Sequence, residues 1–379
     1  MLGVVLAAHA GAVPPPLPAE HVSVQVLPPS SPHWVYVYDE AFDNEIDARV
    51  HLYDGDSFRR LGQIGAGFLP SVAISPDGTT TAVATTYFSR GSRGTRTDVV
   101  ELTDNTTLSV RAEIILPSKR AETTPTLFGV AYSSDAHFLY ASYVTPAASF
   151  GVLDPADHKV LGEIDTAGCV LVIPSGQYRV SSICESGRLL TVTLDAHGHE
   201  TGRAMSAPFF DADRDPVFVQ GIATNTGYAF LSFLGEVHEV DLSGAQPVFA
   251  PTWSLVSAAE KGHWRPGAEQ VGAIQRALGR LYVPMHAGGE GTHKDGGTEI
   301  WVFDMTTHQR LARWTMAAHS PVAPQGLSRI LAVQVSQDRT PILFAATERA
   351  DLAVFDALSG TLRHVEHRMG QTPWMLFNP

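Results

Sequence analysis

"RVHLYDGDSFRRLGQI" (residues 49–64) and "VVELTDNTTLSVRAEI" (residues 99–114) share one form: an alternating strand, an Asp, a polar turn and a second strand. Five later segments repeat this form, and successive aspartates of the seven segments are 41 to 63 residues apart. The aspartates are Asp54, Asp104, Asp154, Asp195, Asp241, Asp304 and Asp356. Each lies where a strand enters a turn, so we expect its carboxylate to accept hydrogen bonds from turn amides rather than to act in catalysis.

A second hairpin lies between successive aspartate segments, as in "VAISPDGTTTAVAT" (residues 72–85). Two hairpins per period make a four-stranded antiparallel sheet, and repetition of such a sheet is typical of propeller blades. "HWVYVYDE" (residues 33–40) lacks an innermost strand before it, and "PWMLFNP" (residues 373–379) can supply one. The sequence therefore predicts an all-β, seven-bladed β-propeller, a single domain over residues 33–379, closed by pairing of the N- and C-terminal strands.

The N-terminal segment, residues 1–32, begins with the apolar run "MLGVVLAA", continues with an Ala-x-Ala pattern and then becomes rich in proline. This order is that of a secretory signal and its cleavage site. No basic residue precedes the run and the run is short, so the signal looks truncated or mis-started. A disordered tail of a cytoplasmic protein is the alternative. No other stretch has the roughly 18 apolar residues of a spanning helix, so we expect a soluble protein with no membrane partner.

The charge balance argues against nucleic acid as a partner. The chain has 26 Lys and Arg against 39 Asp and Glu, a formal net charge of −13. Such a chain repels a phosphate backbone.

Two cysteines, Cys169 and Cys184, flank a predicted hairpin turn. Their separation of 15 residues lets them face each other across an antiparallel hairpin, and a disulfide there fits an oxidising compartment. Two buried free thiols are the alternative. A metal site is not expected, because no histidine stands nearby at ligand spacing.

No catalytic residue is predicted in this chain. The sequence lacks a Gly-x-Ser-x-Gly elbow, a His-Glu-x-x-His pair, a Walker loop and a Cys-x-x-Cys-His haem motif. His197 and His199 lie in a predicted turn, where solvated histidines are commoner than metal ligands. We therefore expect neither a metal nor a cofactor bound by this chain.

Three connections are more elaborate than plain turns. One carries Arg90, Arg93 and Arg96 and ends at Asp98, a spacing suited to clamping carboxylates or carbonyls of a partner, bracing a neighbour, or forming a solvated loop. Another is rich in glycine and carries His293 and Lys294, which makes it a weak candidate for an anion cradle. These six residues are possible interface or structural positions.

The third elaborate connection is the insertion at residues 250–270. Ser257 followed by Glu260 has the capping-box pattern, which predicts one or two helical turns there.

Four motifs carry a family resemblance: "TTYFSRGSRGTRTDVVELTD" (85–104), the cysteine hairpin, "WSLVSAAEKGHWRPG" (253–267) and "MHAGGEGTHKDGGTEIWVFD" (285–304). They resemble the heavy subunit of the tryptophan tryptophylquinone amine dehydrogenases, from about residue 33 to the C-terminus. The last three look closer to the aromatic amine dehydrogenase branch. "AGFLP" (66–70) looks closer to the methylamine branch, although its alanine departs from the paired glycines there.

The resemblance implies a periplasmic assembly of two heavy and two light subunits, with tryptophan tryptophylquinone carried by the light subunit. It implies oxidative deamination of primary amines to aldehyde and ammonia, with electrons passing to a small copper protein such as azurin or amicyanin. This chain would be a scaffold and a wall of the substrate channel.

At the residue level, the resemblance assigns Phe68 to the substrate channel and pairs Cys169 with Cys184 in a disulfide. A core position between blades is the alternative for Phe68. A stand-alone binding propeller and a metal-dependent hydrolase of the lactonase type are the alternative functions.

Overall fold

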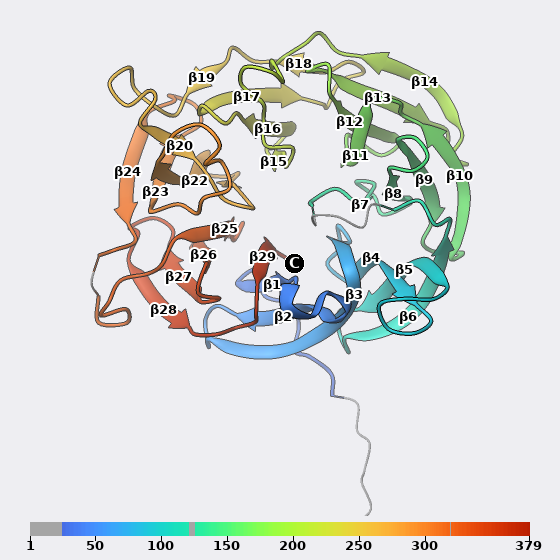
Figure 1. Cartoon of the computed structure of the whole chain (residues 1–379), viewed down its shortest axis with the longest axis horizontal. Helices are drawn as coiled ribbons and strands as arrows, with labels where there is room; N and C mark the ends of the chain where they lie inside the picture. The colour runs from blue at the N-terminus through green and yellow to red at the C-terminus, as the bar shows by residue number, and fades with distance from the viewer. Residues whose placement is uncertain (1–24, 121–125, 319) are drawn as a thin grey trace, which may run out of the picture.

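The computed structural model describes residues 25–120, 126–318 and 320–379. Within them the chain is built from strands and one short 3₁₀ helix, η1 (Phe42–Asp47). The strands group into antiparallel sheets arranged as a ring around a central axis (Figure 1). The predicted all-β architecture is confirmed. Residues 1–24 of the signal-like segment lie outside the described residues.

The first half of the ring begins with a seven-stranded sheet in which β3 is shared by two sets of four strands. The first set comprises β29 (Pro373–Phe377), β1 (Trp34–Asp39), β2 (Ala48–Asp54) and β3 (Arg59–Ile74). The second set comprises β3, β4 (Thr80–Phe88), β5 (Arg96–Asp104) and β6 (Ser109–Leu116). The next sheet comprises β7 (Val130–Tyr132), β8 (Leu139–Tyr143), β9 (Ser149–Asp154) and β10 (Lys159–Asp165). It is followed by β11 (Cys169–Pro174), β12 (Arg179–Cys184), β13 (Leu189–Leu194) and β14 (Glu200–Met205).

The second half of the ring contains three further sheets. The first comprises β15 (Ile222–Ala223), β16 (Gly227–Leu231), β17 (Glu236–Asp241), β18 (Val248–Phe249) and β19 (Trp253–Ser254). The second comprises β20 (Trp264–Pro266), β21 (Ala273–Gln275), β22 (Arg280–Ala287), β23 (Glu299–Asp304) and β24 (Arg310–Thr315). The third comprises β25 (Ile330–Val335), β26 (Ile342–Thr347), β27 (Leu352–Asp356) and β28 (Leu362–Glu366). Counted with the two sets that share β3, the described strands form seven blade-like sets.

The seven repeated aspartates are turn residues, as predicted. In every case the Oδ1 atom accepts a hydrogen bond from the backbone amide two residues later, at 2.6 to 3.0 Å. A carboxylate in this position replaces a backbone acceptor and fixes the chain reversal. The repeat in the sequence is therefore a repeat of turns.

The core lies between the faces of neighbouring sheets. Where the two chain ends meet, Val35, Val37 and Tyr53 pack against Phe344 and Leu352 in one buried cluster. Burial of each such side chain stabilises the fold by about 1.5–3 kcal/mol. Apolar contacts therefore hold neighbouring sheets together.

The terminal strands close the ring, as predicted. β29 pairs with β1 in antiparallel register, with Tyr36 opposite Phe377 and Val37 opposite Leu376. Gln270, 4 % exposed, satisfies the other edge of β29: its Oε1 accepts from Leu376 N at 2.7 Å and its Nε2 donates to Leu376 O at 3.1 Å. The innermost strand therefore has partners on both sides.

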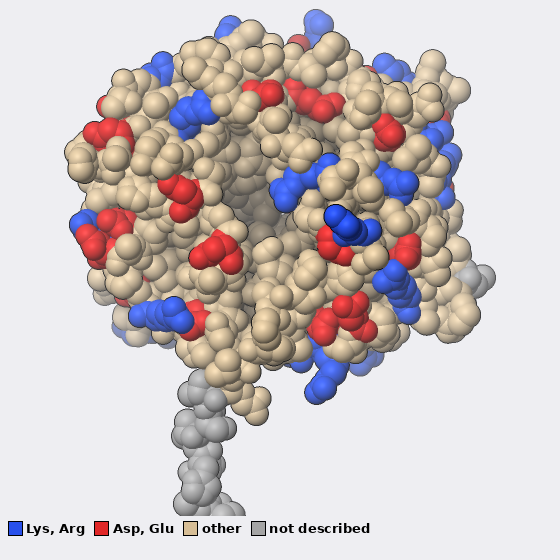
Figure 2. Space-filling view, turned by 180° about the vertical axis from the view of Figure 1, so that it is seen from behind, with Lys and Arg blue, Asp and Glu red and all other residues tan. Residues whose placement is uncertain are grey.

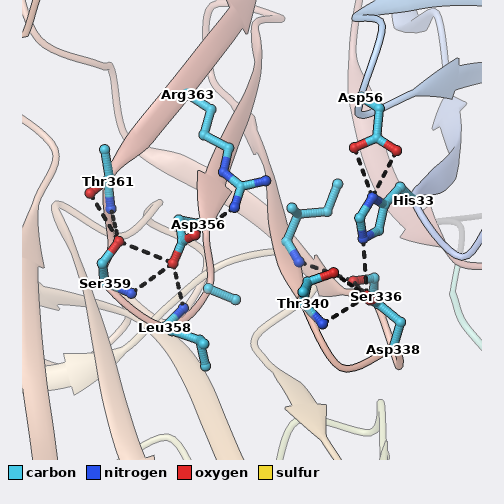
Figure 3. A network of polar contacts seen from close by, with 12 residues as sticks. His33, Asp56, Ser336, Asp338, Thr340, Asp356, Leu358, Ser359, Thr361 and Arg363 are labelled. Atoms are coloured by element: carbon cyan, nitrogen blue, oxygen red, sulfur yellow. Dashed lines mark hydrogen bonds and ion pairs between the residues drawn. The ribbon is translucent and has the colours of Figure 1, made fainter.

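At the end of the ring that carries the aspartate turns, a polar contact joins the blade of β1 and β2 to the blade of β25 and β26. His33, just before β1, lies between Asp56 of the β2–β3 turn and Asp338 of the β25–β26 turn (Figure 3). Its Nδ1 is 2.8 Å from Asp56 Oδ1 and its Nε2 is 3.3 Å from Asp338 Oδ2. Burial raises the pKa of Asp338, but hydrogen bonds from Ser336 and Thr340 outweigh burial and hold that pKa below its usual value.

The insertion at residues 250–270 contains β19 and β20, and the segment between them is not a regular helix. Bonds from Lys261 N to Ser257 O and from Trp264 N to Glu260 O, both 3.0 Å, close two successive turns there, which agrees with the expected one or two turns. The predicted capping-box contact is present: Glu260 Oε2 accepts from Ser257 N at 3.0 Å and from Ser257 Oγ at 2.8 Å. Arg310 also binds Glu260, at 2.9 Å. This hydrogen bond to Arg310 lowers the pKa of Glu260 to about 2, although burial acts in the opposite direction.

Replacing Gln270 tests the closure of the ring. We expect Gln270→Ala to lower the free energy of unfolding by about 1–3 kcal/mol, because buried backbone groups of Leu376 lose hydrogen-bond partners. Gln325→Ala, at an exposed position, is the matched control and should change little. Denaturant unfolding measures both, and equal effects of the two substitutions would contradict a closing role for Gln270.

Candidate functional site

One face of the ring carries the elaborate connections. In an antiparallel sheet, the connection between the second and third strands leaves from the same end as the link to the next blade. This end therefore includes η1, the arginine loop at residues 89–95, and the glycine-rich loop at residues 288–298. We call it the loop face. The aspartate turns lie at the opposite end.

Side-chain contacts join these three connections into one surface. Lys294 Nζ lies 5.9 Å from the centre of the Trp374 ring, and Phe42 of η1 packs edge-on against the same ring at 4.9 Å. A Cβ placed on Gly91 would lie 3.9 Å from Ile46 Cδ1, so η1 also touches the arginine loop. The structure thus brings together loops that are 200 residues apart in the sequence.

Phe68 lies where β3 passes from one blade to the next. Gly67 still pairs with Ala48 in the first set of strands, whereas Phe68 already pairs with Thr86 in the second. The φ angles of Gly67 and Leu69 are +69° and +44°, so the strand turns sharply around Phe68. Its side chain is half-buried and packs edge-on against Phe88 at 5.9 Å. Phe68 therefore stands at the rim of the loop face.

A buried polar network holds the Phe68 turn in place. Arg120, 5 % exposed, donates from Nη2 to Leu69 O at 2.8 Å and from Nη1 to Thr86 Oγ1 at 2.9 Å. Asp98, fully buried, accepts from Thr86 Oγ1 at 2.9 Å and from Arg96 Nε and Nη2 at 2.8 and 2.7 Å. Loss of one partner in such a buried pair costs about 3–5 kcal/mol.

The arginine loop consequently divides into two parts. Arg96 and Asp98 form an internal brace, whereas Arg90 and Arg93 are exposed on the loop. Only the exposed pair is available to a partner chain.

The glycine-rich loop is held by its own neighbours. The His293 ring stacks on Phe233 at 4.0 Å, with 11° between the planes. Lys294 Nζ lies 3.5 Å from Glu269 Oε2, and burial raises the pKa of Glu269 despite that lysine. Because the cation of this loop already faces a carboxylate, its geometry does not favour an anion cradle.

The cysteines form the predicted bridge. Cys169 in β11 lies opposite Cys184 in β12, and the two sulfur atoms are joined in a disulfide. Both side chains are buried in the core between blades. The alternative of two free thiols is excluded.

His197 and His199 occupy the turn between β13 and β14. His199 Nδ1 lies 3.3 Å from Asp195 Oδ2, and both histidine amides bind the same aspartate. No cluster of three metal-ligating side chains occurs in the described parts of the chain. Asp195 thus explains the positions of both histidines.

A central cavity of about 550 Å³ lies along the axis of the ring. The ring is hollowed at its centre on the face shown in Figure 2, where acidic and basic side chains are interspersed around the opening. The cavity wall combines apolar residues with Tyr132, Arg276, Asn378 and several glutamines, and the described residues that line it include no Asp, Glu or His. This wall does not favour the metal-dependent hydrolase alternative, which requires carboxylates around the axis.

Sequence reasoning missed Glu40, the first residue after β1. Its side chain is fully buried, and neither carboxylate oxygen has a hydrogen-bond partner among the described residues. Burial, with a smaller contribution from Glu45, raises its pKa to about 8. Glu40 is therefore protonated in the folded protein at neutral pH. Its sequence position, at the end of an alternating strand, resembles that of an exposed residue and gave no signal.

The fold defines a class: a disulfide-bonded β-propeller without a spanning helix among its described residues. Two solved structures are similar in fold. Dihydro-heme d1 dehydrogenase NirN has a TM-score of 0.53 at 15 % identity, over 94 % of this chain and 77 % of that chain. The β-propeller domain of Cps50 (Swd1) from Myceliophteria thermophila has a TM-score of 0.54 at 11 % identity, over 88 % of this chain and 95 % of that chain. These likenesses establish the propeller fold alone.

The sequence comparison identifies the family. The model of the methylamine dehydrogenase heavy chain family matches residues 32–378, and the chain belongs to that family. The heavy chain from Methylophilus methylotrophus is 27 % identical over 94 % of this chain and 86 % of its own length. The heavy chain from Paracoccus versutus is 28 % identical over 90 % of this chain and 78 % of its own length. The family resemblance drawn from the motifs is confirmed.

The raised pKa of Glu40 predicts that the stability of the protein depends on pH. Between its ordinary pKa of 4.5 and the folded value of about 8, the folded state holds a proton that the unfolded state has released. Stability therefore falls as pH rises through this window, by about 1.4 kcal/mol per unit. We expect Glu40→Gln to remove this loss and to stabilise the protein at pH 8 by on the order of 3 kcal/mol relative to wild type.

Unfolding by denaturant at pH 5 and pH 8 measures this difference. Asp43→Asn, at an exposed position on η1, is the control and should leave the wild-type pH dependence in place. If Glu40→Gln and wild type lose the same stability between the two pH values, the buried carboxyl does not carry the proton.

Proposed function

We propose that this chain is the heavy subunit of a periplasmic amine dehydrogenase made of two heavy and two light subunits. Residues 33–379 form the propeller domain and residues 1–32 the export segment in this proposal. The membership of the chain in the methylamine dehydrogenase heavy chain family supports it. The reaction is oxidative deamination of a primary amine to an aldehyde and ammonia.

The light subunit carries the tryptophan tryptophylquinone in this proposal and accepts two electrons from the amine, which then pass to a small copper protein such as azurin or amicyanin. This chain supplies no catalytic residue. Its contribution is to cover the site, exclude water and select the amine, which an aromatic wall does by size.

The loop face is the proposed docking surface for the light subunit. It carries five exposed large apolar side chains, which range from 38 % exposed for Val144 to 48 % for Leu234; the others are Phe42, Ile46 and Val219. Exposed apolar residues rimmed by charge mark protein interfaces. Arg90 and Arg93 can contribute guanidinium hydrogen bonds to a partner at the rim of this surface. The exposed apolar side chains of the loop face are the observation that carries the docking proposal.

Phe68 is the proposed wall of the substrate channel at this interface. It lies on the rim of the loop face and is only half-buried, so part of its ring remains available to a neighbouring chain. The buried Arg120 that binds Leu69 O keeps the turn rigid, which a size filter requires. Whether the enzyme prefers methylamine or a larger aromatic amine then depends on the space left beside this ring.

Separating the subunits tests the assignment. We expect the heavy chain alone to show no quinone absorbance and no dye reduction with amines, and to gain activity when it is co-expressed with a light chain. Leu234→Asp should weaken recovery of the light chain by roughly tenfold, because it places a charge in a buried apolar contact. Leu358→Asp is the matched control, since Leu358 is 50 % exposed but lies in an aspartate turn at the opposite end. Activity of the heavy chain alone, or equal loss in both variants, would contradict the proposal.

Phe68→Ala tests the channel wall in the assembled enzyme. We expect the ratio of kcat/KM for phenylethylamine to that for methylamine to rise by about tenfold, because removal of the ring opens space for larger side chains. Phe58→Ala, in the β2–β3 turn, is the control. An unchanged ratio in Phe68→Ala would remove this residue from the channel.

A further inference from the structure

A second cavity, of about 320 Å³, lies at the seam where the two ends of the chain meet. One wall is formed by β2 and β3 through Arg49, His51 and Arg60. The other wall is the link between β28 and β29, which contributes Arg368 and Gln371. We call this space the seam cavity. It is separate from the central cavity, with which it shares no lining residue.

His51 is the buried polar group of the seam cavity. Its side chain is 3 % exposed, and its Nε2 lies 3.5 Å from Asp39 Oδ2. Its Nδ1 has no hydrogen-bond partner among the described residues. A buried polar nitrogen without a partner costs about 1–3 kcal/mol. A ligand in the cavity that offers an oxygen to His51 would recover that cost.

The arginines of the cavity carry more positive charge than its carboxylates neutralise. Asp47 is paired with Arg49. Arg60 binds only the neutral side chain of Gln63 among the described residues, and Arg368 forms no ion pair with any of them. Three arginines and two aspartates therefore line the cavity, which leaves one guanidinium charge without a matching carboxylate, even though the whole chain is acidic.

Asp39, the remaining carboxylate, is occupied by backbone amides. Its oxygens accept hydrogen bonds from Thr372 N at 2.6 Å, Gln371 N at 2.9 Å and Ala41 N at 3.3 Å. These bonds stabilise the carboxylate form of Asp39 and fix the link between β28 and β29 as one wall of the cavity.

The backbone around the seam cavity is held in conformations that ordinary residues avoid. Ala41 and Arg368, both in its lining, have φ angles of +51° and +56°. Gly370 approaches the Asp39 carboxylate so closely that a Cβ there would overlap it. Strained backbone of this kind persists where the surroundings fix it, and it is common at ligand sites.

We propose that the seam cavity binds one small oxoanion, a phosphate or a small carboxylate, between Arg60, Arg368 and His51. Guanidinium groups bind both kinds of anion through charge-assisted hydrogen bonds, and the imidazole adds a donor from the buried side. Because Arg60 and Arg368 belong to opposite ends of the chain, the bound anion also joins the two sides of the seam. Anion binding thus stabilises the closed ring, independently of amine oxidation.

Titration calorimetry on the full chain tests the proposal, with inorganic phosphate and acetate as separate ligands at constant ionic strength in sodium chloride. We expect saturable binding of one anion per chain and a midpoint of thermal unfolding that rises with its concentration. Tighter binding of phosphate identifies a phosphate-type ligand, and tighter binding of acetate identifies a carboxylate. Absence of saturable binding by either anion would overturn the proposal.

Variants locate the binding site. Arg368→Gln, at an exposed position, should raise the dissociation constant by roughly tenfold or more. His51→Gln should act in the same direction where the variant folds. Arg59→Gln, exposed on the same strand as Arg60 but outside the cavity, is the matched control and should bind as wild type. Wild-type affinity in Arg368→Gln would place the anion elsewhere and overturn the proposal.

Discussion

The antiparallel pairing of β29 with β1 is the contact on which the rest of the ring depends. Neighbouring blades hold each other mainly through apolar faces, which supply stability but little directional control. Hydrogen bonds between the first and last segments fix how the ring closes. Gln270 and Asp39 reinforce this closure by binding the backbone of β29 and of the link before it. Because the ring is closed, the connections of the first and last blades lie next to each other on the loop face.

The fold could be predicted because its repeat is local. Each aspartate turn is specified by a carboxylate and an amide two residues away, so seven copies are visible in the sequence without any knowledge of long-range contacts. The pairing of Cys169 with Cys184 could be predicted for the same reason, since one hairpin joins them. Ser257 and Glu260 form their local contact as well, within the two turns that connect β19 to β20.

The candidate site was harder to predict from the sequence, because its side chains contact segments that are distant in the chain. Asp98 and Arg96 are neighbours in sequence, yet their role depends on Arg120 and on the carbonyl of Leu69. The spacing of three residues predicts that the arginines act together. In the structure Arg96 binds Asp98 inside the protein, whereas Arg90 and Arg93 are exposed. Glu40 and His51 gave no signal at all, because only the fold shows that they are buried.

The strand that carries Phe68 belongs to two blades, which bears on the role proposed for this residue. β3 runs for 16 residues and is the outer strand of one blade and the inner strand of the next. The change of partner occurs between Gly67 and Phe68. The backbone at Phe68 therefore lies where two blades meet, and the buried Arg120 holds the carbonyl of Leu69 beside it. This rigidity matters for the channel wall proposed at Phe68, because a rigid wall discriminates between ligands of different size more sharply than a mobile one.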